Sequence, residues 1–150
     1  MMSALQMIAI GRKLANLYND LAAPICKKYG VNQTGFDILL FCANNPQYNT
    51  ARDLCAVRGI KSGIVSVAVE QLIRSGFLFR CTDEADRRIH RLVPTEKAQL
   101  LIDEGREMQR IFTEALRQGI TPEELTAFQS LTDKLTGNIA NLERKENEQR

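Results

Sequence analysis

The chain has 150 residues, of which 44% are hydrophobic and 25% charged, the composition of an ordinary globular protein. This length is enough for one domain with its own core. The formal net charge is only +2, so total charge does not indicate nucleic-acid binding, but residues 50–97 carry nine basic and six acidic side chains. The basic middle segment favours an anionic partner near the centre of the chain.

Two classes of protein are disfavoured at once. No apolar run approaches the ~18–20 residues that a membrane-spanning helix needs, so no membrane partner is expected. The first apolar run precedes the basic pair Arg12 and Lys13, the reverse of a secretory signal, and we expect a cytoplasmic protein. The four cysteines form no CxxC pair, which predicts small buried thiols rather than disulfides or a metal site, with a redox-sensing thiol as the alternative: Cys26, Cys42, Cys55 and Cys81.

The first predicted elements are two helices. Apolar residues recur at helical intervals near the N-terminus: Leu5, Ile8, Leu14, Leu17, Leu21 and Ile25. A long first helix is therefore expected, with Pro24 as a kink or as the end of its regular part and Gly30 as its stop. Asn32 is a suitable cap for a second helix, which should stop at Asn45, before Pro46.

The middle of the chain predicts a helix-turn-helix. Thr50-Ala51-Arg52-Asp53 resembles a capping box and opens a short helix that ends at Gly59. The stretch "SGIVSVAVEQLIRSG" follows within a few residues and predicts a second helix ending at Gly76. Its expected core face consists of residues three and four apart: Val65, Ala68, Val69 and Leu72.

A hairpin and two long helices complete the pattern. "FLFRCT" and "RIHRLV" are rich in strand formers, and "DEAD" between them is a turn. Thr95 is expected to cap a helix that runs to about Gln118, before Gly119. Thr121-Pro122-Glu123-Glu124 is a strong start signal for the last helix. That helix carries a nearly coiled-coil stripe: Leu125, Phe128, Leu131, Leu135, Ile139 and Leu142.

This order of elements predicts a mainly α (α+β) fold, a winged helix-turn-helix with long N- and C-terminal dimerisation helices. We expect one domain over residues 1–150, with a winged lobe at 32–95 and a helical lobe formed by 1–31 and 96–150. The apolar faces of the terminal helices exceed what so small a central module can cover. A symmetric homodimer is therefore expected.

The run "TARDLCAVRGIKSGIVSVAVEQLIRSGFLFRCTDEADRRIHRLVPTEKA" resembles the DNA-binding core of the MarR (multiple antibiotic resistance regulator) family of bacterial transcription factors. The matching residues are Asp53-Leu54, Ser66, Leu72, Gly76, Asp86-Arg87-Arg88 and Thr95. The resemblance implies a cytoplasmic homodimer that binds double-stranded DNA, dimerises through its flanking helices and responds to a small, often aromatic ligand. It marks no ligand-binding residues in this chain.

The second helix of the helix-turn-helix is the candidate DNA-recognition helix, because its N-terminal half would read base edges in a major groove. The candidate residues lie opposite the predicted core face: Lys61, Ser62, Gly63, Ser66 and Val67. Lys61 suits a phosphate or guanine, and Val67 suits a thymine methyl group. Ile64 is also apolar where a polar side chain would be expected. The alternative is an ordinary amphipathic helix with a solvated polar face.

In the predicted wing, Arg87 and Arg88 stand at the base of the hairpin and are candidates for a minor groove. Asp86 can hold the Arg88 guanidinium, a role that the resemblance implies. Asp83 and Glu84 are expected to be solvated tip residues. Candidate phosphate contacts, each equally well explained as a surface charge, are Arg52, Arg58, Arg80 and Arg91.

No Ser-His-Asp, P-loop or paired-carboxylate arrangement has the right spacing, so neither an enzyme nor a cofactor or metal site is predicted. The first hypothesis is a homodimeric regulator that binds a pseudo-palindromic operator. The second is a winged-helix adaptor for another protein, which the modest charge and the apolar Ile64 and Val67 favour.

Overall fold

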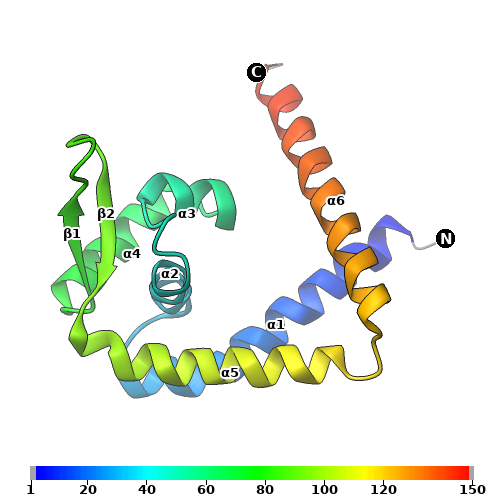
Figure 1. Ribbon diagram of the computed structural model, residues 1–150, viewed down its shortest axis with the longest axis horizontal. Coiled ribbons are helices and arrows are strands. Elements are labelled where there is room, and N and C mark those ends of the chain that lie inside the picture. Colours follow the sequence, from blue (N-terminus) through cyan, green and yellow to red (C-terminus); the bar gives the residue numbers. More distant parts are fainter. Residues whose placement is uncertain (1–2, 149–150) are drawn as a thin grey trace. The chain divides into compact units, whose positions relative to one another are not determined.

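The computed structural model describes residues 3–148 (Figure 1). Its elements are α1 (Ala4–Tyr29), α2 (Gln33–Asn44), α3 (Ala51–Arg58), α4 (Ser62–Arg74), β1 (Leu78–Thr82), β2 (His90–Pro94), the 3-10 turn η1 (Glu96–Ala98), α5 (Gln99–Arg117) and α6 (Pro122–Glu148). The mainly α fold with a small antiparallel sheet is confirmed.

The helix ends follow the local signals. Ser3 and Gln6 form a capping box at the start of α1, and the helix continues through Pro24 to a left-handed Gly30. The Asn32 side chain accepts a hydrogen bond from the backbone N–H of Gly35 (2.8 Å) and caps α2, which ends before Asn45 as predicted. Because each cap satisfies an orphan backbone group, short sequence signals were enough to place these ends.

The helix-turn-helix is also confirmed. At the start of α3 the Thr50 hydroxyl and the Asp53 carboxylate cap each other's backbone N–H groups, and a left-handed Gly59 ends the helix. Helix α4 buries the predicted face: Val65, Ala68, Val69 and Leu72. These residues join the core formed with α2, in which Phe36 and Leu39 are fully buried.

The hairpin is shorter on one side than expected. Strand β2 begins at His90 and pairs antiparallel with β1, from Thr82–His90 to Leu78–Pro94. Arg88 and Ile89, which were predicted to lie in the strand, belong to the connecting loop instead. The backbone N–H of Leu92 donates to the carbonyl of Asn49 (2.8 Å), so the segment before α3 lies along the outer edge of β2.

Thr95 does not cap a long helix directly. It precedes η1, its side chain makes no capping hydrogen bond within the described structure, and α5 starts at Gln99. The Thr95 hydroxyl donates instead to the carbonyl of Gly76 (2.5 Å), and the Lys97 ammonium donates to the carbonyl of Ser75 (2.7 Å). Both contacts hold the turn between α4 and β1, which explains why the hydroxyl is not available to α5.

The described residues up to Phe112 form one compact unit, and those from Thr113 form a second. In the first unit, Figure 1 shows α1 alongside α5, and hydrogen bonds join the two helices, such as Gln109 Nε2 to Tyr18 Oη (2.8 Å). In the second unit, Thr121 and Glu124 form the predicted capping box of α6. None of the described α6 residues, 122–148, is buried. The predicted division into lobes at residues 32 and 95 stays a prediction.

Candidate nucleic-acid interface

The N-terminal half of α4 presents one exposed face. Every predicted contact residue there is exposed: Lys61, Ser62, Gly63, Ser66 and Val67. The Lys61 side chain makes no capping hydrogen bond with the described residues, although it stands at a position where Ser, Thr, Asp or Asn is preferred. Lys61 therefore leaves the first N–H groups of α4 without a side-chain cap. Uncapped N–H groups at a helix N-terminus favour a nearby anion.

The same face is apolar at its centre. Ile64 is 51% exposed and Val67 58% exposed. Helix α4 contains one acidic residue, Glu70, and its carboxylate lies 2.6 Å from the Arg80 guanidinium on β1. Arg80 was predicted as a phosphate contact, and here it offsets the only negative charge of the helix.

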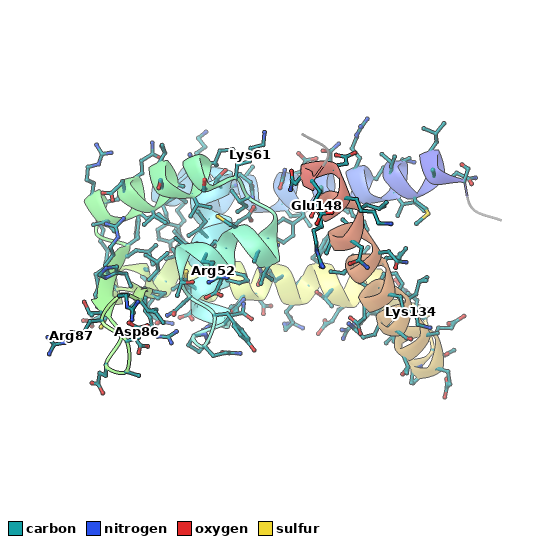
Figure 2. All side chains as sticks on the ribbon, turned by 90° about the horizontal axis from the view of Figure 1, so that it is seen from above. Arg52, Lys61, Asp86, Arg87, Lys134 and Glu148 are labelled. Atoms are coloured by element: carbon teal, nitrogen blue, oxygen red, sulfur yellow. The ribbon has the colours of Figure 1, made fainter. Side chains whose placement is uncertain are left out.

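Asp86, Arg87 and Arg88 lie in the loop at the hairpin tip, which corrects the predicted place of the two arginines at its base. The backbone N–H of Arg88 donates to Asp86 Oδ1 (3.0 Å), and the Arg88 Nε lies 3.5 Å from the same oxygen. The Arg88 side chain is 94% exposed. Figure 2 shows Arg87 extending away from the hairpin, while Lys61 lies at the start of α4. The tip therefore presents two arginines, one of them held by Asp86.

Asp83 is not the solvated tip residue that we expected. Its Oδ1 accepts hydrogen bonds from the backbone N–H groups of Ala85 (2.9 Å) and Asp86 (3.1 Å), and its Oδ2 lies 2.6 Å from Arg91 Nε. The hydrogen bond from Arg91, followed by those from the backbone, lowers the pKa of the Asp83 carboxyl. Asp83 thus fixes the loop that carries the arginines. An Asp followed by a short turn is a sequence signal that could have identified it.

The three other candidate phosphate contacts differ in their surroundings. Arg91 also donates to Asn49 Oδ1 (3.1 Å), so its guanidinium joins the wing to the segment before α3. Arg58 lies 3.6 Å from Asp37 of α2. Arg52 is exposed near the start of α3 and makes no ion pair with the described residues (Figure 2). Arg52 is therefore the one whose charge is most available to an anion.

A cavity of about 150 Å³ lies between α1, α2, α5 and the end of α3, and sequence reasoning did not find it. Its lining is mixed aromatic and polar: Tyr18, Asp37, Leu40, Phe41, Asn44, Asn45, Arg58 and Gln109. Burial raises the pKa of the Asp37 carboxyl, which its hydrogen bond from Gln33 opposes. Because the lining residues come from four helices, no local sequence pattern could mark this site.

The cysteines divide into two kinds. Cys26 and Cys42 are buried as predicted, and burial raises the pKa of the Cys42 thiol to about 12. Cys55 is half-buried, and Cys81 is exposed on β1, which corrects the prediction of four buried thiols. Within residues 3–148, no group of three His, Cys, Asp or Glu side chains is placed to hold a metal ion. The same residues contain no helix with the length and apolarity of a membrane span.

The helix-turn-helix, its exposed second helix and the hairpin whose tip carries two arginines define a winged-helix protein. Residues 29–89 match the family model described as MarR family.

Solved structures share the fold over nearly the whole chain. A MarR protein from Peptoclostridium difficile has 20% identity and a TM-score of 0.75, with 94% of each chain covered. A MarR family regulator from Listeria monocytogenes, complexed with a 26-mer DNA, has 23% identity and a TM-score of 0.75, covering 94% of this chain and 91% of that one. CouR from Rhodococcus jostii, bound to p-coumaroyl-CoA, has 17% identity and a TM-score of 0.72, with coverages of 87% and 88%.

Proposed function

We propose that this chain is a homodimeric transcriptional regulator that acts in the cytoplasm by binding a pseudo-palindromic operator. The observation that carries the proposal is the exposed N-terminal half of α4, which contains no carboxylate, while the single carboxylate of the helix, Glu70, is paired with Arg80. Lys61, Arg87 and Arg88 add positive charge at the start of this helix and at the wing tip. A helix face whose only carboxylate is paired, with lysine and arginine side chains beside it, suits the DNA backbone. The DNA complex of the Listeria relative supports this assignment.

In this proposal α4 and the wing contact different parts of the DNA. The exposed face of α4 enters a major groove, while Arg87 and Arg88 reach the neighbouring minor groove, whose negative potential attracts guanidinium groups. Asp86 holds Arg88 in position through the contact to its Nε. Lys61, Ser62 and Arg52 contact phosphates and fix the register of the helix on the duplex.

The homodimer follows from unpaired apolar surface. Phe128 of α6 is 66% exposed, Leu131 53% and Leu142 64%. In α1, Leu5 and Ile8 are also more than half exposed. A second copy that covers these faces would place two recognition helices about one helical turn of DNA apart, as a pseudo-palindromic site requires.

Ligand control is the third part of the proposal. A cavity of about 150 Å³ is large enough for one small aromatic ring. Its lining includes Arg58 at the end of α3, so a ligand bound there contacts both the long helices and the helix-turn-helix. A ligand that prefers one spacing of the two recognition helices shifts the population toward that state and changes DNA affinity. The CouR complex shows a ligand-bound relative of the same fold.

The decisive experiment is selection of bound genomic fragments by the purified protein, followed by titration of the recovered site. Recovery of one inverted-repeat sequence, bound by the dimer with an affinity that falls steeply with salt, is the expected result. Recovery of fragments without a common sequence, at the yield of a protein-free control, would reject the proposal.

A second candidate function is a winged-helix adaptor that binds another protein through the same face. The exposed Ile64 and Val67 favour it, because apolar surface suits a protein interface. Titration with mixed genomic duplex at low salt separates the two functions, since a DNA-binding dimer must show non-specific affinity there. A dimer with no detectable affinity would be the adaptor.

A further inference from the structure

The exposed face of α4 carries two large apolar side chains that the core does not use. Ile64 and Val67 are three residues apart, so they lie on one face of the helix, roughly 4.5 Å apart along its axis. Both are more than half exposed, whereas Val65 and Val69 on the opposite face are 1% and 2% exposed. The core therefore does not explain their apolar character.

The neighbouring residues offer little hydrogen-bonding power to a base. Residues 61–67 contain no Arg, Asn, Gln, Asp or Glu, the residue types that make bidentate or charged contacts with guanine, adenine or cytosine. Lys61 and two serines are the only side-chain donors, and serine does not discriminate between bases. At Gly63 a Cβ would have no described neighbour within 4 Å, so this part of the helix has a low profile beside Ile64.

One feature of the major groove matches such a surface. Thymine presents a C5-methyl group there, and apolar side chains recognise it by contact. The charged surroundings of the pair favour DNA over an apolar protein partner: Lys61 precedes Ile64, and the carboxylate nearest in α4 is paired with Arg80. Two apolar side chains flanked by groups that bind phosphate suit a site that contains thymine base pairs.

We infer that Ile64 and Val67 read thymine methyl groups in the major groove, so that each operator half-site carries thymines opposite these two side chains. The inference rests on the proposed function, because it assigns sequence specificity to the same face. Affinity and specificity then have separate sources. The phosphate contact of Lys61 and the minor-groove contacts of the wing give affinity, and the two apolar side chains give preference for thymine over cytosine and uracil.

The test uses the duplex recovered by genomic selection, with each thymine of a half-site replaced in turn by deoxyuridine, which removes only the methyl group. Burial of one methyl group corresponds to about a fourfold change in affinity. For the wild-type dimer we expect such a loss at one or two positions per half-site, measured by fluorescence anisotropy at constant salt. For Val67→Ala or Ile64→Ala, the loss at the matching position should shrink below about twofold.

Val57→Ala is the matched control, because Val57 is 64% exposed but lies on α3. It should keep the full deoxyuridine effect. A wild-type dimer that binds the operator but tolerates deoxyuridine at every position would overturn the inference and leave DNA binding intact. An effect that persists in both α4 variants would overturn the assignment to these residues. A wild-type dimer that binds no duplex would reject the proposed function itself and leave the face to a protein partner.

Discussion

At the scale of single residues, Gly105 shows how tightly α5 packs on α2. A Cβ added there would lie 2.9 Å from Leu40 Cδ1 and 3.1 Å from Phe36 Cε2. Both neighbours are essentially fully buried, so they have little room to move. We expect Gly105→Ala to lower the free energy of unfolding by about 1–2 kcal/mol, since overpacking outweighs the gain in helix propensity.

Urea denaturation measures this change, with Gly137→Ala in α6 as the control. No described atom outside the local backbone would lie within 4 Å of a Cβ at Gly137. That variant should therefore gain stability from helix propensity alone, by about 1 kcal/mol. If Gly105→Ala gains stability by a similar amount, the close approach of α5 to α2 is wrong.

Asp83 makes the wing sensitive to acid. The contacts from Arg91 and the backbone hold its pKa in the folded state below the unfolded value, so the folded state binds fewer protons between the two values. Its contribution to stability is therefore complete above the unfolded pKa of about 3.9 and is lost as the pH falls through the lowered folded pKa.

Melting temperatures of the wild type and of Asp83→Asn, measured from pH 7 down to strong acid, test this prediction. The two proteins should differ most at neutral pH and converge in acid. Glu84→Gln, a change of the same charge at the adjacent exposed residue, should track the wild type throughout. A difference between Asp83→Asn and the wild type that does not depend on pH would contradict the ionic contact.

At the scale of the elements, α4 and the wing should contribute to DNA affinity through charge. Lys61→Ala and Arg88→Ala are each expected to weaken operator binding and to reduce the slope of log affinity against log salt by about one per lost phosphate contact. Lys134→Ala in α6 removes the same charge from a different element and should leave the slope unchanged (Figure 2). If Lys61→Ala and Arg88→Ala both bind the operator as tightly as the wild type at several salt concentrations, the assigned contacts are refuted.

The elements also show where sequence reasoning succeeds. The starts of α2, α3 and α6 depend on a side chain and a backbone N–H three residues away, so the sequence alone predicted them. Thr95 was misread because its hydroxyl had two possible partners, and only the folded chain brings Gly76 within reach. Asp83 was misread for a similar reason: its partner Arg91 faces it only in the hairpin register that forms. The DNA contacts themselves remain predictions.

At the scale of the whole molecule, periodicity predicted α6 and its apolar stripe but could not say what covers the stripe. None of the described residues of this helix is buried. Even the apolar Leu131 and Ile139 of the stripe are more than half exposed. A large apolar face left in water is costly, since each buried aliphatic side chain contributes about 1.5–3 kcal/mol. Coverage by a second copy removes this cost.

Leu131→Glu tests whether that second copy is present. A carboxylate buried without a partner is strongly unfavourable, so the dissociation constant of the dimer should rise by about tenfold or more. Ser130→Glu adds the same charge one residue away, about 100° around the helix and outside the apolar stripe, and should leave the dimer intact. Sedimentation equilibrium over a range of protein concentrations measures both. Two outcomes would contradict a dimer formed through this stripe: a wild-type chain that sediments as a monomer, or a Leu131→Glu dimer as stable as that of Ser130→Glu.

Loss of dimerisation should also change DNA binding, because two recognition helices must act together on a pseudo-palindrome. Specific operator binding should be abolished, while each monomer keeps its weak, salt-sensitive affinity for any duplex.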